Sequence, residues 1–297
     1  MKTRDRLAYL PYLAPGMVLF IGVIAIPFAM NIGISFTRWA GVGTPDWIGL
    51  GNYRELAEDS EFWASFRHQF ALVFGMSLIP AAIGLVLASV LTEVIGKRFG
   101  PRTASVLRAC IYLPQLLPIV VAGIVWSWIM APEGGAANAL LEAVGLDSLA
   151  HDWLGDPKTA MWSVMVVMVW FQIGFPLVIF MSGLQRVDPS LYEAAEIDGA
   201  SWWRRFWHIT LTQIRPEIFV VLLITAIYSL KSFPQIYVLT KGGPGGATNV
   251  PSYYSYQNFF EKTDVGYGAS IATVLTLITI VLAAGFIRVQ NKSLEEQ

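Results

Sequence analysis

Six polar side chains that could bind a solute stand inside long apolar stretches of the sequence. They are Gln115, Gln172, Tyr228, Ser229, Lys231 and Ser232. Hydroxyl and amide groups beside aromatic rings suit a sugar, because the rings stack on the sugar while the polar groups pair with its hydroxyls. Tyr228 and Ser232 are four residues apart, which would place them on one face of a helix. Hydrogen bonding between membrane helices explains such residues equally well, so both interpretations stay open.

A second set of residues that could do chemistry lies in segment 185–216, between two apolar stretches. Asp188 and Pro189 are typical of the N-cap and first turn of a helix, and Gly199 is typical of the residue that ends one. A second helix is expected to begin at Ser201, with aromatic and cationic residues that suit a membrane surface. On composition alone, the first helix is either a surface helix without a partner or a contact site for another protein. Its small and acidic residues are Glu193, Ala194, Ala195 and Asp198.

The elements that position these residues are expected to be membrane helices. Of the 297 residues, 55% are hydrophobic and only 14% are charged, against about 25% charged in soluble domains. Spanning a bilayer takes roughly 20 apolar residues, and six stretches qualify. They are about 11–36, 70–95, 107–130, 159–184, 217–240 and 268–290. We therefore predict an all-α membrane protein of about six transmembrane helices that forms a single domain over 1–297, with the first stretch an uncleaved membrane helix.

The distribution of lysine and arginine predicts the orientation, because cytoplasmic loops are enriched in these residues. With the N-terminus inside, thirteen of the twenty cations fall on the cytoplasmic side. They are Lys2, Arg4, Arg6, Lys97, Arg98, Arg102, Arg108, Arg186, Arg204, Arg205, Arg215, Arg288 and Lys292. Six fall on the outer side, although the outer segments are longer. We therefore expect both termini and segment 185–216 to be cytoplasmic.

The spacing of residues in segment 185–216 resembles that of a known family. Glu193-Ala194-Ala195, followed by Gly199 and then by Ile209-x-Leu211, is similar to the EAA loop of binding-protein-dependent ABC importer permeases. The segments WFQIGFPLVIFMSGLQRVDPSLYEAAEIDGA and FPQIYVLTKGGPGGAT resemble the carbohydrate branch, typified by the maltose transporter. Two residues depart from the family pattern: Thr212 stands where proline usually follows the Ile-x-Leu, and Pro234 stands where an acidic residue often occurs.

The resemblance implies the type I ABC importer permease fold and a transport function without catalysis in this chain. It implies that segment 185–216 holds a coupling helix that docks on an ATPase. The implied docking residues are Glu193, Ala194, Ala195, Asp198, Gly199, Ile209 and Leu211. The implied partners are a second permease subunit, two ATPase subunits that bind ATP and Mg, and an extracytoplasmic solute-binding protein. The implied location is the prokaryotic cytoplasmic (inner) membrane, and the solute is expected to be a sugar or sugar derivative.

The sequence has no short motif of a catalytic or nucleotide-binding site. It lacks the GxxxxGK[ST] phosphate loop, HExxH, GxSxG and paired cysteines. We therefore expect no catalytic residue, metal site or cofactor in this chain, and the net charge of -1 gives no basic surface for nucleic acid. The alternative function is an ion-coupled secondary transporter, for which Glu93 is the one acidic candidate. An intramembrane enzyme is a third hypothesis, without a visible catalytic pair.

Two smaller features complete the expectations. The glycine-rich segment Gly242–Gly246 is interpreted either as a flexible turn or as a contact with an external solute-binding protein. Cys110, the single cysteine, lies in an apolar run and is expected to be buried.

Overall fold

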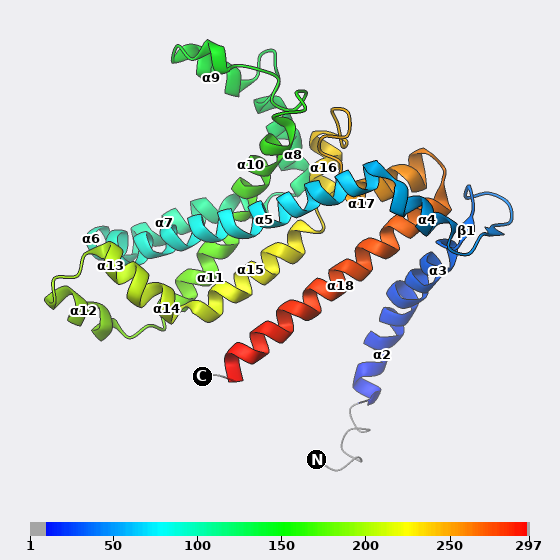
Figure 1. Cartoon of the computed structure of the whole chain (residues 1–297). Coiled ribbons are helices and arrows are strands. Elements are labelled where there is room, and N and C mark those ends of the chain that lie inside the picture. Colours follow the sequence, from blue (N-terminus) through cyan, green and yellow to red (C-terminus); the bar gives the residue numbers. More distant parts are fainter. Residues whose placement is uncertain (1–9, 296–297) are drawn as a thin grey trace. The chain divides into compact units, whose positions relative to one another are not determined.

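The computed structural model describes residues 10–295, which are mostly helical (Figure 1). The described residues form two compact units: one lies within Met1–Phe62 and Tyr254–Ile278, and the other within Trp63–Tyr253 and Thr279–Gln297. The expected single domain over 1–297 stays a prediction. The cations Lys2, Arg4 and Arg6, which carry part of the orientation argument, lie outside the described residues.

The first unit begins with an apolar helix that has no protein core around it. Three consecutive segments form this helix: α2 (Leu10–Phe20), the π-helical turn η1 (Ile21–Ala25) and α3 (Ile26–Ile34). Within the described part of the unit, no residue from Tyr12 to Ile34 is buried. A helix that is hydrophobic on every side is typical of a membrane span, as expected for the stretch 11–36.

A small cap follows this helix and closes the first unit. Strand β1 (Thr37–Arg38) pairs antiparallel with β2 (Asp46–Trp47), with Thr37 opposite Trp47. The buried Asn52 of α4 (Gly51–Glu58) donates hydrogen bonds to the carbonyls of Ser35 and Thr37, at 2.8 and 2.9 Å. These bonds fix the chain direction where the apolar helix ends, since a buried backbone carbonyl must be paired.

The second unit is built around a long helix and a kinked pair. The helix α5 (Ser60–Ser89) continues through the π-helical turn η2 (Val90–Ile95) into α6 (Gly96–Phe99). Against it packs α11 (Gly174–Leu184), which follows α10 (Ala160–Gln172) after a one-residue break. The core of the second unit joins these helices to the segments that follow them. Its buried residues are Ala81, Leu85, Ala88, Leu91, Leu177, Phe180, Met181, Leu184, Phe206, Ile214 and Val221.

The remaining elements lie between and after these helices. In chain order they are α7 (Pro101–Tyr112), the 3-10 turn η3 (Leu113–Leu116), α8 (Ile119–Ile129), α9 (Ala136–Ala143), η4 (Asp147–Leu149), α12 (Pro189–Ile197), α13 (Trp202–Arg205), η5 (Phe206–Thr210), α14 (Leu211–Gln213), α15 (Arg215–Ser229), α16 (Phe233–Leu239), α17 (Pro251–Tyr256), η6 (Gln257–Glu261) and α18 (Val265–Glu295).

Four helices among the described residues are long and apolar enough to cross a membrane, and two bent pairs raise this number to six if each pair is one span. The single helices are Tyr12–Ile34, Ser60–Phe99, Ala160–Leu184 and Val265–Gly285. The bent pairs are Pro101–Leu116 with Ile119–Ile129, and Trp202–Gln213 with Arg215–Ser229. This range agrees with the expected all-α membrane protein of about six helices.

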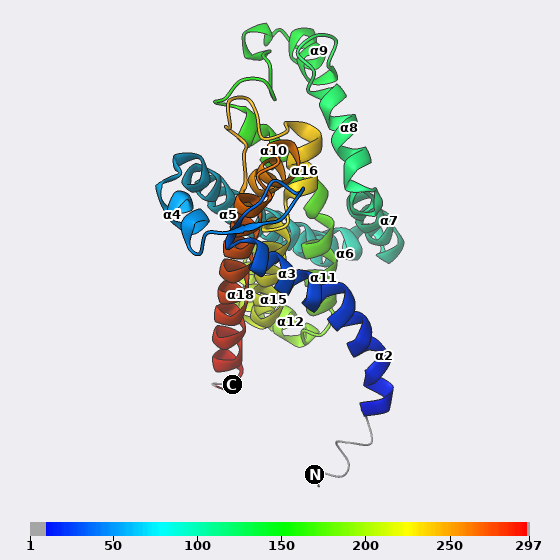
Figure 2. The ribbon, with the colours of Figure 1, turned by 90° about the vertical axis from the view of Figure 1, so that its right-hand side faces the viewer.

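Besides the stretch 159–184, with its one-residue break between α10 and α11, two predicted stretches are not continuous helices. The stretch 107–130 bends by 96° (Figure 2), because Pro118 forces Leu117 into an extended conformation with ψ 142. The stretch 217–240 breaks after Ser229, and Ser232 is the N-cap of α16 rather than a residue of α15. The prediction that Tyr228 and Ser232 share one helix face is therefore wrong. In a continuous helix Pro234 would clash with the carbonyl of Leu230, whereas the first turn of a new helix accepts proline.

Cys110 is exposed, so the expectation of a buried thiol is wrong. The residue lies on α7, most of whose side chains are exposed in the single chain. An apolar run in a membrane protein does not imply burial in the protein, because lipid is an apolar solvent as well.

Candidate functional site

The helix α12 forms where the sequence predicts it, within segment 185–216. The carboxylate of Asp188 accepts a hydrogen bond of 2.9 Å from the backbone N–H of Ser190, which lowers the pKa of Asp188. Pro189 occupies the first turn, and the helix ends before Gly199, whose φ is +73. The predicted N-cap and the predicted left-handed glycine are both confirmed.

The expected docking residues divide into an exposed group and a packed group. The exposed residues are Glu193, Ala194, Asp198 and Gly199, and Ala195 is half-buried. Ile209 and Leu211 are also half-buried, and Leu211 packs against the core of the second unit. Sequence reasoning missed Ile197, which is 87% exposed at the end of α12. An apolar residue so exposed on a polar helix is a signal for a contact surface.

The chain returns from α12 through three short helical segments, α13, η5 and α14 (Figure 1). The ring of Trp202 stacks on the buried Phe206, with centroids 5.3 Å apart. Trp203 and Trp207 are exposed. A bend of 74° at Ile214 then leads into α15. Thr212, which replaces the usual proline of the family, lies before this bend, and Pro216 takes a place in the first turn of α15.

A network of ion pairs connects α12 to α13 and to the end of the long helix. The Nη1 atom of Arg205 lies 2.6 Å from Oε1 of Glu196, and its Nη2 atom lies 3.8 Å from Oε2 of Glu93. Lys97 Nζ lies 3.5 Å from Glu196 Oε1. The side chains of Arg205 and Glu93 are only 13% and 8% exposed. Buried charges persist only when paired, and Arg205 supplies the opposite charge beside Glu93.

Hydrogen bonds make a second connection from α12 to the long helix. The hydroxyl of Tyr192 lies 3.0 Å from Thr210 Oγ1, which in turn donates to Glu93 Oε1 at 3.5 Å. Burial raises the pKa of Tyr192 above its ordinary value, so this phenol stays protonated and available as a donor. Thr210 is fully buried.

The polar residues predicted to line a solute path lie where α15, α16, α10 and η3 meet their neighbours. The α16 helix packs against α8 and α10, and η3 also packs against α10. Gln172 is the last residue of α10, is 2% exposed, and has an Oε1 atom without a hydrogen-bond partner in the described part of the chain. Oε1 of Gln115, in η3, likewise lacks a partner among the described residues. Two buried amide oxygens without partners are groups that a polar solute could satisfy.

The residues of α15 and the following turn have different surroundings. The hydroxyl of Tyr228 accepts a bond of 3.5 Å from Gln235 Nε2. Ser229 and Ser232 are fully buried and are held by Gln69, which donates from Nε2 to the Ser229 carbonyl at 2.9 Å and accepts from Ser232 Oγ at 3.5 Å. Lys231 is exposed in the turn between α15 and α16. Sequence reasoning missed Gln69, because it stands just outside the apolar stretch 70–95.

The glycine-rich loop after α16 is held by its own hydrogen bonds. Thr248 Oγ1 donates to the carbonyl of Gly243 at 2.7 Å and lies 2.7 Å from Thr240 Oγ1. His68 Nδ1 lies 2.9 Å from the carbonyl of Asn249. Gly245 and Gly246 are exposed at the tip and have positive φ. The base of this loop is thus fixed by hydrogen bonds, and both interpretations of the segment, a flexible turn and a contact with a solute-binding protein, stay predictions.

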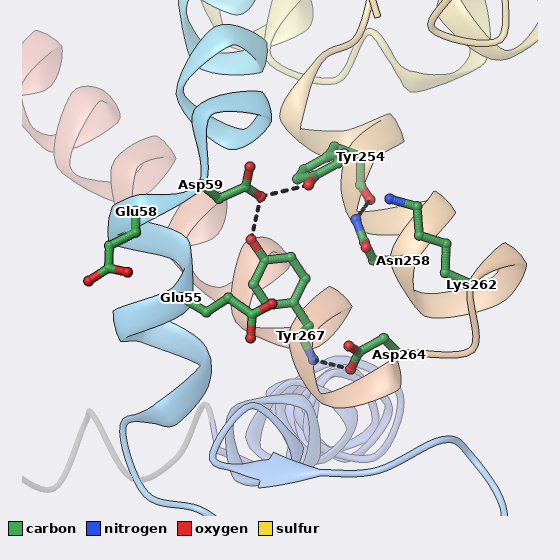
Figure 3. Close-up of a pocket in the computed structure, with 8 residues that line it drawn as sticks. All are labelled: Glu55, Glu58, Asp59, Tyr254, Asn258, Lys262, Asp264 and Tyr267. Atoms are coloured by element: carbon green, nitrogen blue, oxygen red, sulfur yellow. Dashed lines mark hydrogen bonds between the residues drawn. The ribbon is translucent and has the colours of Figure 1, made fainter.

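The first unit carries a polar pocket around Asp59 (Figure 3). Its lining residues are Glu55, Glu58, Asp59, Tyr254, Asn258, Lys262, Asp264 and Tyr267. The hydroxyls of Tyr254 and Tyr267 both point at Asp59 and donate hydrogen bonds to its Oδ2 atom (Figure 3). Burial alone would raise the pKa of Asp59, but these bonds lower it below its ordinary value, and burial beside Asp59 raises the pKa of Tyr254. In the described part of the chain, no group of three His, Cys, Asp or Glu residues could hold a metal ion.

Comparison with known proteins shows the family to which this chain belongs. Residues 81–295 match the family described as binding-protein-dependent transport system inner membrane component. A probable ABC transporter permease protein of Pyrococcus horikoshii is 34% identical over 279 residues, covering 93% of each chain. The trehalose/maltose transport system permease protein MalF of Thermococcus litoralis is 32% identical over 288 residues, covering 96% of this chain and 93% of the relative.

A solved structure has the same fold. One chain in the crystal structure of a bacterial ABC transporter involved in the import of the acidic polysaccharide alginate superposes with a TM-score of 0.81. The two chains are 23% identical, and the match covers 97% of this chain and 96% of the other.

The helical architecture and the α12–α14 segment thus define a membrane-embedded transport subunit. The chain belongs to the family of binding-protein-dependent transport system inner membrane components. It is a multi-pass ABC importer permease, a transport component rather than an enzyme. The expected type I permease fold and the expected class of function are confirmed.

Proposed function

We propose that this permease imports a sugar or sugar derivative and that α12 is its coupling helix. The observation that carries the coupling role is the exposure of α12, whose surface displays Glu193, Ala194 and Ile197 at the start of the spacing that resembles the family's EAA loop. Small side chains at Ala194 and Ala195 allow close approach of a partner, and Glu193 and Asp198 can pair with its basic residues. Gly199 permits the sharp turn, and Ile209 and Leu211 pack the return segment.

The proposed solute path runs past Gln172, Gln115 and the residues around α15 and α16. Tyr228 offers an aromatic face with a hydroxyl, and its neighbour Gln235 offers an amide. Ser229, Ser232 and Lys231 complete the set, the two serines by supporting the turn through Gln69. The name of the Thermococcus litoralis relative, a trehalose/maltose permease, supports a carbohydrate as solute.

The proposed assembly contains a second permease subunit, two ATPase subunits and an extracytoplasmic solute-binding protein, in the prokaryotic inner membrane. Both termini and α12 are proposed to be cytoplasmic, from the asymmetry of lysine and arginine. ATP and Mg bind to the ATPase subunits, and ATP binding closes them and moves the coupling helices. The spans then shift from an inward-facing to an outward-facing population, and the binding protein delivers the solute.

Uptake into proteoliposomes tests this proposal. The permease is reconstituted with its partner permease, ATPase and binding protein, and uptake of radiolabelled maltose, trehalose, chitobiose, glycerol phosphate and an amino acid is compared. We expect ATP-dependent uptake of at least one of the sugars. Uptake driven by a proton or sodium gradient without ATP would instead support the ion-coupled alternative, and uptake restricted to the amino acid would overturn the carbohydrate assignment.

A further inference from the structure

The attachment of α12 to the rest of the second unit involves few buried apolar contacts. Within the described residues, α12 contains no buried residue, and none of its side chains belongs to the core of the second unit. Its backbone link to α13 passes through Gly199, which has φ +73. Apart from Gly199 itself and its two chain neighbours, no atom of the described residues lies within 4 Å of the position that a β-carbon would take at Gly199. Backbone hydrogen bonds from Gly199 to the Glu196 carbonyl, at 3.1 Å, and from Ala200 to the Ala195 carbonyl, at 2.9 Å, close this end of the helix.

Polar side chains supply the connection that packing does not. The guanidinium of Arg205 lies between two carboxylates, 2.6 Å from Glu196 on α12 and 3.8 Å from Glu93 on η2. Because η2 continues α5 without a break, Glu93 is fixed to a membrane span. The planar guanidinium faces both carboxylates at once, at hydrogen-bond distance from Glu196 and at ion-pair distance from Glu93, an arrangement that a lysine ammonium holds less rigidly.

The Tyr192–Thr210–Glu93 chain of hydrogen bonds ends on the same carboxylate. Two routes from α12, one ionic and one neutral, therefore meet at Glu93. Arg205 and Glu93 are shielded from solvent, so salt and water screen their interaction little. These side chains therefore connect α12 to η2 and α5 in addition to the hydrogen-bonded backbone at Gly199.

We propose that Arg205 is a positioning residue that makes α12 and the second membrane span move as one body, by bridging Glu196 to Glu93. This inference rests on the proposed coupling role of α12 and names the link through which that role acts. It assigns no contact between Arg205 and the ATPase or the solute. Removal of Arg205 should leave the exposed docking surface intact and uncouple its movement from the spans.

The test compares Arg205→Ala with Arg204→Ala in the reconstituted complete transporter. Arg204 is an adjacent, exposed arginine that makes no ion pair among residues 10–295, so it controls for the loss of one positive charge. We expect Arg205→Ala to retain the ATPase on co-purification but to lose at least tenfold of its solute-stimulated ATP hydrolysis and uptake. Arg204→Ala should stay within twofold of wild type in all three measurements.

A double variant separates positioning from simple charge neutralisation. Arg205→Ala leaves the buried Glu93 unpaired, and Glu93→Gln in the same chain removes that charge. We expect Arg205→Ala/Glu93→Gln to recover the expression and thermal stability of wild type without recovering uptake, and Arg205→Lys to recover uptake in part. Recovery of uptake by the double variant would overturn the proposal, as would normal uptake by Arg205→Ala or loss of the bound ATPase from it. Failure of the wild-type chain to bind the ATPase would instead contradict the proposed function of α12.

Discussion

The phenol hydroxyl of Tyr254 donates a hydrogen bond of 2.6 Å to the Asp59 carboxylate, and Tyr267 donates to the same oxygen. These bonds tie the junction of α4 and α5 to α17 and to the start of α18, all within the first unit. They depend on an ionised acceptor, because a protonated Asp59 accepts less strongly.

This arrangement predicts acid sensitivity of the first unit. The pKa of Asp59 is lower in the folded chain than in the unfolded chain, where it is about 3.9. The carboxylate therefore adds stability above about pH 4, and this contribution is lost as the pH falls through the lower folded-state pKa. Thermal unfolding of the purified chain should show Asp59→Asn less stable at neutral pH and closer to wild type in acid.

The exposed Glu58 provides the matched control, since it lines the same pocket. Glu58→Gln should follow the wild-type curve at each pH. A constant difference between Asp59→Asn and wild type across the acid range would contradict the role of Asp59 ionisation.

Gly199 is expected to be the most sensitive single position of segment 185–216. At its φ of +73, any residue that has a β-carbon is strained by about 1 kcal/mol or more. Because the space around Gly199 is free, a substitution there acts through backbone strain and through contact with the partner, and not through a clash within the chain. Asparagine and aspartate both tolerate this conformation, so Gly199→Asn should retain the ATPase and most uptake. Gly199→Val should lose ATPase on co-purification through strain, and Gly199→Asp through the charge that it adds at the docking surface. Equal retention by all three variants would remove Gly199 from the docking role.

Tyr228 is expected to contribute to solute passage without contributing to assembly. Tyr228→Ala removes the ring and the group that pairs with Gln235, and uptake should fall several-fold while basal ATP hydrolysis stays near wild type. Tyr228→Phe keeps the ring and loses one neutral hydrogen bond of about 1 kcal/mol, so its loss should be smaller. Ile224→Val, on the same helix and partly exposed, serves as the control. Unchanged uptake kinetics in Tyr228→Ala and Gln172→Ala would withdraw the proposed path.

Residues that begin and end helices made much of segment 185–216 predictable. Asp188, Pro189 and Gly199 each act on their own neighbours, so the bounds of α12 follow from the chain itself. The breaks at Pro118 and after Ser229 were harder to predict, because an apolar stretch of sequence looks the same whether its helix is straight or bent. Proline was the available signal in both cases.

The contacts that organise the site depend on residues far apart in the sequence. Arg205 reaches Glu93, more than a hundred positions earlier, and Gln69 reaches Ser229 and Ser232. Helix periodicity gives no information on such pairs, because it describes one helix at a time. The exposure of Cys110 was not predicted for a related reason, because an apolar stretch does not reveal whether protein or lipid covers it.

Cross-linking from α12 tests the central claim most directly. In a Cys110→Ser background, which removes the single native cysteine, Ala194→Cys and Ile197→Cys place thiols on the exposed surface of α12. Val42→Cys, 88% exposed in the first unit, is the control. With the complete transporter and a short thiol-to-amine cross-linker, the account predicts adducts with the ATPase from positions 194 and 197 and none from position 42. Efficient ATP-driven uptake without an ATPase adduct from either α12 position would contradict it.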